Sequence, residues 1–118
     1  MQILVIEDDK RISDFLIKGL EENNHLVTLC KNAELVLENY LNIQFDLIIC
    51  DIRMPEMTGD KFLSYVKKND LFKSIPVIML SSEDSTAERI KLLEDGASNY
   101  IVKPFNPMEI KVRIKKII

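Results

Sequence analysis

The chain has 118 residues and a formal net charge of −3, and it is 47% hydrophobic and 30% charged. These values are ordinary for a globular domain with its own core, so we expect one domain over residues 1–118. No apolar run approaches the ~20 residues of a membrane span, no secretory signal precedes the first apolar run, and the acidic balance disfavours nucleic-acid binding. We therefore expect a cytoplasmic protein that contacts neither membrane nor nucleic acid directly.

Short apolar runs alternate with amphipathic stretches along the chain. The predicted strands span 2–7, 26–30, 46–51, 75–80 and 99–102, and the predicted helices span 11–23, 32–42, 59–69, 85–95 and a stretch opened by Asn106 and Pro107. In the first helix, the helical period places Phe15 on one buried face with Ile12, Leu16 and Leu20. The same period directs Leu35 of the second helix inward.

Five strands alternating with five helices predict a (βα)5 chain. The expected fold is a flavodoxin-like three-layer α/β/α sandwich around a five-stranded parallel sheet. Because crossovers are right-handed, few topologies remain, and the strand order 2-1-3-4-5 is favoured, with its ligand crevice between strands 1 and 3. Cys30 and Cys50 would then lie in strands separated by a third strand. That separation is too large for a disulfide, so both should be buried thiols.

Acidic side chains follow the two strands that flank this crevice. Glu7 and Asp8 come directly after the first strand, and Asp51 ends the third. Clustered carboxylates repel one another, and a cation that prefers oxygen ligands relieves the repulsion. Two or three carboxylates suit Mg²⁺ better than Ca²⁺, and zinc is disfavoured because neither His25 nor a cysteine joins the cluster.

Two further polar residues end neighbouring strands at the same edge. Ser81 ends the fourth strand and Lys103 ends the fifth. A hydroxyl, an ammonium and Mg²⁺ around one carboxylate form a site for a phosphoryl group, since each can neutralise a different oxygen. A carboxylate can itself be the nucleophile, which would give an aspartyl-phosphate.

Four segments together resemble the receiver domain of bacterial two-component response regulators. They are ILVIEDD at 3–9, DIRMP at 51–55 with Gly59, PVIMLSS at 76–82, and GASNYIVKPF at 96–105. The resemblance covers essentially the whole chain, in the same order and at the same spacings. It implies that Asp51 is the phosphoacceptor and that a sensor histidine kinase is the donor.

The resemblance also implies roles for the surrounding residues. The implied magnesium ligands are Glu7, Asp8, Asp51 and the backbone carbonyl of Arg53. Ser81 and Lys103 would bind the phosphoryl oxygens, and Tyr100 would be an aromatic switch that turns inward as Ser81 moves. The Lys103–Pro104 bond is often cis in this family. The protein would catalyse only its own phosphorylation and dephosphorylation, so it would not be an enzyme in the usual sense.

In the winged-helix transcription regulators of this family, the fourth helix, fifth strand and fifth helix form a homodimer surface held by charge pairs. Arg89 and Glu109 match one such pair. Arg113 matches the basic half of another pair, but Asn99 replaces the usual aspartate. Phosphorylation would then control dimerisation or output, either through a C-terminal domain outside this sequence or by protein–protein binding of a stand-alone receiver.

Two other functions fit the fold but not the residues. A Mg²⁺-dependent aspartyl-phosphate phosphohydrolase needs a second aspartate two residues after the nucleophile, and Arg53 stands there. A flavodoxin-like FMN protein needs a loop of small and hydroxyl residues after the first strand. Glu7, Asp8 and Asp9 occupy that loop and would repel a phosphate.

Overall fold

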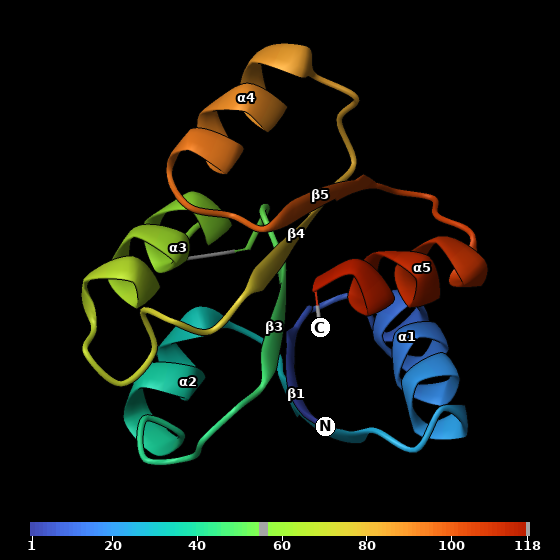
Figure 1. Ribbon diagram of the computed structural model, residues 1–118, viewed down its shortest axis with the longest axis horizontal. Coiled ribbons are helices and arrows are strands. Elements are labelled where there is room, and N and C mark those ends of the chain that lie inside the picture. The colour runs from blue at the N-terminus through green and yellow to red at the C-terminus, as the bar shows by residue number, and fades with distance from the viewer. Residues whose placement is uncertain (55–56, 118) are drawn as a thin grey trace.

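Ten elements alternate strictly between strand and helix in the computed structural model, which describes residues 1–54 and 57–117 (Figure 1). They are β1 (Gln2–Ile6), α1 (Lys10–Glu22), β2 (Leu26–Cys30), α2 (Ala33–Asn39), β3 (Leu47–Asp51), α3 (Gly59–Lys68), β4 (Val77–Ser81), α4 (Thr86–Glu94), β5 (Asn99–Val102) and α5 (Pro107–Ile117). Pro55 of the second motif lies outside the described residues. Among those residues, no helix is both long enough and apolar enough to cross a bilayer.

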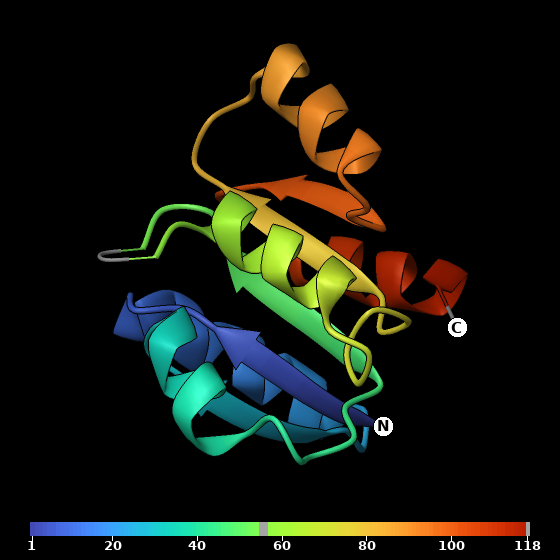
Figure 2. The ribbon, with the colours of Figure 1, turned by 90° about the vertical axis from the view of Figure 1, so that its left-hand side faces the viewer.

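All neighbouring strands pair in parallel, and the sheet order is β2-β1-β3-β4-β5. The predicted topology is therefore confirmed. In Figure 2 the strand arrows point toward one common edge of the sheet. The carboxyl ends of the strands meet at that edge, and the loops that follow them carry the polar residues singled out in the sequence.

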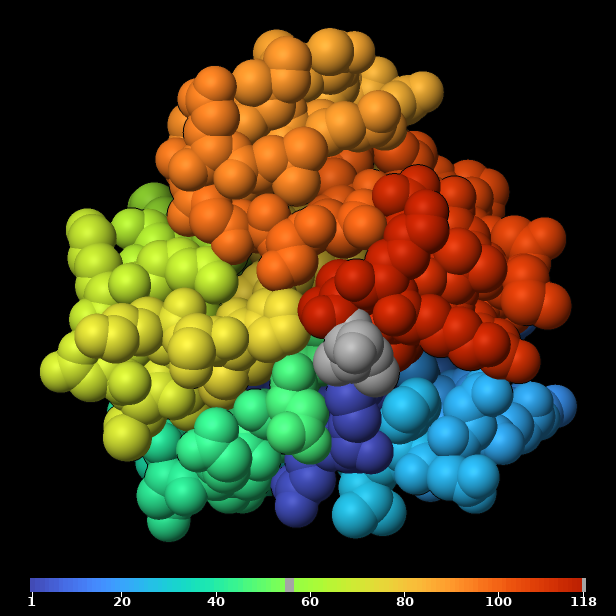
Figure 3. Space-filling view, in the orientation of Figure 1, coloured from blue at the N-terminus to red at the C-terminus, as the bar shows by residue number. Residues whose placement is uncertain are grey.

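The side chains of each strand alternate between two hydrophobic cores. On one face of the sheet, Leu4 and Ile6 of β1 pack with α2, α3 and Leu92 of α4. On the other face, Ile3 and Val5 pack with α1 and α5. Figure 1 shows α2 and α3 on one side of the strands and α1 and α5 on the other, and Figure 3 shows α5 beside α1 at the surface. Both faces of the sheet are covered, as a parallel sheet requires.

The central strand β3 positions Asp51, the predicted nucleophile, at its last residue. All five of its residues are buried. Its last residue, Asp51, pairs in register with Leu80 of β4, and Ser81 of β4 pairs with Val102 of β5. Burial on both faces fixes the register, because a slip by one residue would place Asp51 in a core.

Several details differ from the sequence-based predictions, including the end of α2, which lies at Asn39 and not at Asn42. Phe15 is 47% exposed and Leu35 is 37% exposed, so both lie outside the cores. The Phe15 ring instead packs against Phe105, with 6.0 Å between ring centroids, at the edge where α1 meets α5. Strand β4 begins at Val77, after Pro76, because proline has no N–H to donate to the ladder. Cys30 and Cys50 are free and buried, as predicted.

Gly59 is the one glycine whose lack of a side chain the site requires. A Cβ atom there would lie 2.5 Å from the Asp51 carbonyl oxygen and 2.7 Å from the Ile52 Cα. Its N–H donates to the Ile52 carbonyl at 2.8 Å, which ties the start of α3 to the end of β3. The close approach therefore holds the segment that follows Asp51.

Gly59→Ala should lower the free energy of unfolding by about 1–3 kcal/mol, because backbone atoms cannot yield to the added methyl group as a flexible side chain can. Denaturant titration would measure the change. Gly19→Ala is the matched control, since a Cβ at Gly19 meets nothing within 4 Å. In the middle of α1 that change should raise stability by roughly 0.5–1 kcal/mol. Equal stability of Gly59→Ala and the wild type would contradict the close approach.

Candidate functional site

Three carboxylates meet at the carboxyl edge of β1 and β3. One oxygen each of Glu7, Asp8 and Asp51 lies within 4.8 Å of the other two. Glu7 and Asp51 are buried, with 1% and 4% of their surface exposed, whereas Asp8 is exposed. The structure thus gathers the predicted carboxylates into a cluster that opens to solvent on the Asp8 side.

Backbone hydrogen bonds separate the roles of the three consecutive acidic residues. The Glu7 N–H donates to the Cys30 carbonyl at 3.1 Å, which continues the β1–β2 ladder and fixes Glu7 at the strand end. Glu7 Oε2 accepts from the Asp9 N–H at 3.2 Å. Asp9 Oδ1 caps α1 by accepting from the Arg11 N–H at 2.9 Å. Asp9 therefore serves the helix, and only the first two acidic residues join the cluster.

Lys103 supplies the positive charge in this cluster. Its Nζ lies 2.7 Å from Glu7 Oε1 and 3.1 Å from Asp51 Oδ1, and only 14% of its side chain is exposed. It follows β5, before a cis peptide bond to Pro104, and its N–H donates to the Ser81 carbonyl at 2.6 Å. One ammonium among three carboxylates leaves a net negative charge when all four groups are ionised.

The pKa values of Glu7 and Lys103 are both raised, for different reasons. Burial and the neighbouring Asp51 charge raise the pKa of Glu7 to about 6, although Lys103 opposes the shift. For Lys103, burial alone would lower the pKa, but Glu7 and Asp51 outweigh it and hold the pKa above its ordinary value. Lys103 therefore stays charged at neutral pH, whereas ionisation of Glu7 carries the free-energy cost of desolvating its buried carboxylate.

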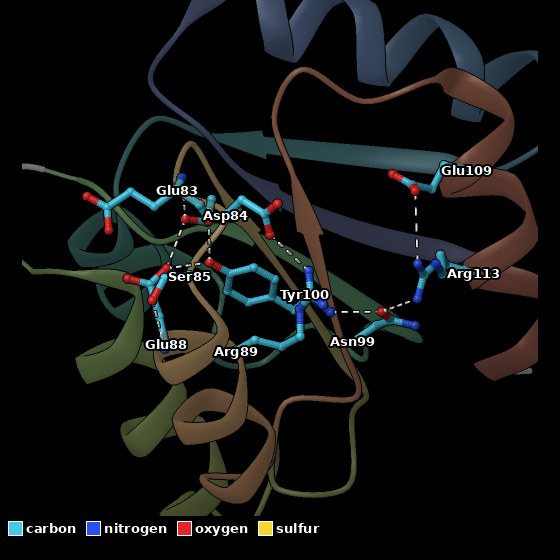
Figure 4. A network of polar contacts seen from close by, with 10 residues as sticks. Glu83, Asp84, Ser85, Glu88, Arg89, Asn99, Tyr100, Glu109 and Arg113 are labelled. Carbon is cyan, nitrogen blue, oxygen red and sulfur yellow. Dashed lines mark hydrogen bonds and ion pairs between the residues drawn. The ribbon is translucent and has the colours of Figure 1, made fainter.

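Ser81 and Tyr100 also lie at this end of the sheet, but their hydroxyls are bonded toward α4. Ser81 Oγ donates to Glu88 Oε1 at 2.9 Å and accepts from the Glu83 N–H at 3.0 Å. The buried Tyr100 hydroxyl lies 2.6 Å from Glu88 Oε1 and 2.7 Å from the Glu83 carbonyl oxygen (Figure 4). The structure thus places Ser81 near the carboxylates without directing its hydroxyl at them.

Glu88 has a part in this network that sequence reasoning missed. Ser85 and Glu88 have the spacing of a capping box, in which the glutamate returns to the backbone of the capping residue. Ser85 Oγ does accept from the Glu88 N–H at 3.2 Å. The Glu88 carboxylate points instead to Ser81 and Tyr100. The spacing signals a helix start, but it does not signal these tertiary partners.

Arg53 lies at the exposed rim of the cluster. Its N–H donates to Asp51 Oδ1 at 3.4 Å, and its guanidinium forms an ion pair with Glu83. Ligation of a metal by the Arg53 carbonyl stays a prediction.

The residues of the predicted dimer surface have partners within the chain (Figure 4). Arg113 donates to Asn99 Oδ1 at 2.9 Å and lies 3.9 Å from Glu109 Oε2. Arg89 lies 3.5 Å from Asp84 Oδ1 and 5.4 Å from the centre of the Tyr100 ring. All are surface contacts of the kind that contributes little to stability, so they leave these charges available to another molecule.

The raised pKa of Glu7 predicts a pH dependence of stability in the metal-free protein. Between its ordinary pKa of 4.5 and about 6, the folded state binds more protons than the unfolded chain, so the free energy of unfolding falls as pH rises. Protonation of Glu7 contributes about 1–2 kcal/mol to the free energy of unfolding below this range. Glu7→Gln, which mimics the protonated form, should remove this pH dependence.

Denaturant titrations from pH 4 to pH 7.5 in a chelator would measure this difference. Glu38→Gln, at an exposed position of α2, is the control and should follow the wild type. A constant stability difference between wild type and Glu7→Gln over the whole pH range would contradict the shift.

Comparison with known proteins identifies one protein family over nearly the whole chain. The family model described as the response regulator receiver domain matches residues 3–115. The transcriptional regulatory protein ResD of Bacillus subtilis is 32% identical over 117 residues, which are 99% of this chain and 48% of ResD. The phosphate regulon regulator PhoB of Escherichia coli is 34% identical over 98% of this chain and 51% of PhoB. The chain thus spans about half the length of these relatives.

Solved structures agree with the fold. The chemotaxis response regulator CheY4 of Vibrio cholerae superposes with a TM-score of 0.92 at 27% identity, over 99% of this chain and 98% of CheY4. The receiver domain of the sensor histidine kinase PA1611 of Pseudomonas aeruginosa superposes with a TM-score of 0.87 at 22% identity, over 98% of this chain and 94% of that domain. That domain holds a magnesium ion coordinated in its active-site cleft.

Proposed function

The chain belongs to the response regulator receiver domain family, and on this premise we propose that Asp51 accepts a phosphoryl group from a sensor histidine kinase. The observation that carries the proposal is the buried Asp51 carboxylate beside Lys103 and two further carboxylates. A carboxylate so placed is a nucleophile with a cation already beside the position of the incoming phosphoryl oxygens.

The donor atoms of the cluster fit Mg²⁺. They are carboxylate oxygens, and Lys103, whose Nζ lies 2.7 Å from Glu7 Oε1, neutralises only one of their three negative charges. Glu7, Asp8 and Asp51, with the Arg53 carbonyl, would hold the ion. When bound, Mg²⁺ neutralises phosphoryl oxygens and relieves the repulsion among the carboxylates.

The transfer itself needs few groups from this chain. An oxygen of Asp51 attacks the phosphorus, an O–P bond forms, and the bond from phosphorus to the donor nitrogen breaks with its electrons remaining on the donor imidazole. Lys103 stabilises the negative charge on the phosphoryl oxygens. The Ser81 hydroxyl donates to one of them once it leaves Glu88. Arg53 carries no acid or base function, which disfavours a phosphohydrolase.

Incubation with Mg²⁺ and acetyl phosphate should add one phosphoryl group to the wild type and none to Asp51→Asn. The reason is that the amide of asparagine is not a nucleophile toward phosphorus under these conditions. Intact-protein mass spectrometry would count the groups. Asp14→Asn, an exposed aspartate of α1, is the matched control and should be phosphorylated like the wild type.

Omission of Mg²⁺ should abolish the adduct in the wild type and in Asp14→Asn. An adduct on Asp51→Asn, or none on the wild type even with the stable phosphoryl mimic beryllofluoride, would refute phosphorylation of Asp51.

The output of the switch is proposed by analogy with the relatives. ResD and PhoB are transcriptional regulatory proteins about twice as long as this chain. We propose that phosphorylation favours a homodimer through α4, β5 and α5, in which Arg89 of one copy pairs with Glu109 of the other. A two-fold interface would contain this pair twice, which doubles its contribution.

Sedimentation of the beryllofluoride-bound protein would test the dimer. Arg89→Glu or Glu109→Arg should each weaken dimerisation about 5-fold or more, because each reversal places like charges together twice. The double reversal should restore most of the affinity. Equal weakening in the single and double variants would exclude an intermolecular Arg89–Glu109 pair.

A further inference from the structure

Glu88 of α4 connects two hydroxyl groups, one from the end of β4 and one from β5. A single oxygen, Oε1, is 2.9 Å from Ser81 Oγ and 2.6 Å from the Tyr100 hydroxyl. Figure 4 shows Glu88 and Tyr100 side by side, with Glu83 and Ser85 of the preceding loop around them. These contacts join the end of β4 and Tyr100 within β5 to the first turn of α4.

The Ser81 hydroxyl has no hydrogen left for another acceptor. A serine hydroxyl carries one hydrogen, and here it is donated to the Glu88 carboxylate. The oxygen already accepts from the Glu83 N–H at 3.0 Å, and only 1% of Ser81 is exposed. A hydrogen bond to an ionised carboxylate is among the stronger ones in proteins. Ser81 can therefore donate to a phosphoryl oxygen on Asp51 only after it leaves Glu88.

Tyr100 does not depend on Glu88 alone. Its hydroxyl has a second acceptor, the Glu83 carbonyl oxygen at 2.7 Å, and its ring lies under the Arg89 guanidinium at 5.4 Å. Because a phenol donates a single hydrogen, it can keep the bond to Glu83 when Glu88 moves. Release of Ser81 is thus separable from the burial of Tyr100.

We propose that Glu88 is a positioning residue that holds the Ser81 hydroxyl away from Asp51 until a phosphoryl group competes for it; the inference rests on the proposed function. A phosphoryl group adds three strong acceptor oxygens and up to two negative charges. It can displace Glu88 as the acceptor for Ser81. The exchange leaves the Glu88 carboxylate without one of its donors, and this change at the start of α4 reports the state of Asp51.

The proposal predicts that loss of Glu88 strengthens binding of a phosphoryl mimic. We expect Glu88→Ala to lower the dissociation constant for beryllofluoride in saturating Mg²⁺ about 5- to 10-fold, because no bond to the carboxylate has to break first. Fluorine NMR of the bound mimic would give the constant. Glu94→Ala is the matched control, since it removes an exposed carboxylate from the end of the same helix.

A double-mutant cycle separates this effect from a change in overall charge or folding. In a Ser81→Ala background the hydroxyl is absent, so Glu88→Ala should leave the dissociation constant unchanged. Glu88→Gln keeps an acceptor at the same position without the charge, and it should strengthen binding about 2- to 3-fold. It also replaces Glu88→Ala in the cycle should the alanine variant fail to fold.

Two results would overturn the proposal: equal affinities of the Glu88 variants and the wild type, or the same gain in both serine and alanine backgrounds. In contrast, failure of the wild type to bind beryllofluoride at all would overturn the proposed function itself. The two failures are thus distinguishable.

Discussion

The ion pairs of Lys103 with Glu7 and Asp51 make the buried carboxylates tolerable. Two negative charges lie almost out of solvent at the carboxyl edge of the sheet, and unpaired buried charges cost several kcal/mol each. The compensating ammonium comes from β5, whereas the carboxylates come from β1 and β3. The pairing therefore links strands that are not neighbours, and the position of each charge depends on the strand order of the whole sheet.

Both groups expected to hold a phosphoryl group already have partners. Lys103 is engaged by Glu7 and Asp51, and Ser81 by Glu88, so neither waits unpaired for a ligand. The incoming group must offer more than these partners do. It can, because it brings several oxygens and a larger charge than a single carboxylate. In the proposed function, the free energy gained from the new bonds, beyond the cost of breaking the old ones, would favour a shift of the β4–α4 loop and α4.

Different parts of this molecule were predictable from sequence to different degrees. The gathering of Glu7, Asp8, Asp51 and Lys103 follows from one rule, that parallel strands end at a common edge, and it needs no knowledge of rotamers. The exposure of Phe15 did not follow from its helical period. The period identifies the face of α1 that packs on the sheet, but it does not identify which position on that face stays exposed beside α5. The contact of Glu88 with Ser81 was also missed, because it depends on which of two hydrogen-bonding partners a flexible side chain selects in three dimensions.

The residue before the proposed phosphoacceptor raises a question of chemical selectivity. Cys50 and Asp51 are consecutive nucleophiles, and the Cys50 Sγ lies 3.3 Å from the Asp51 carbonyl oxygen. Burial, followed by the negative charges of Asp51 and Glu7, holds the pKa of the Cys50 thiol well above its ordinary value. A protonated thiol is a poor nucleophile and resists oxidants, because both reactions require the thiolate. Burial and the neighbouring negative charges therefore suppress reaction at this sulfur, which would keep the proposed phosphoryl signal independent of the redox state of its surroundings.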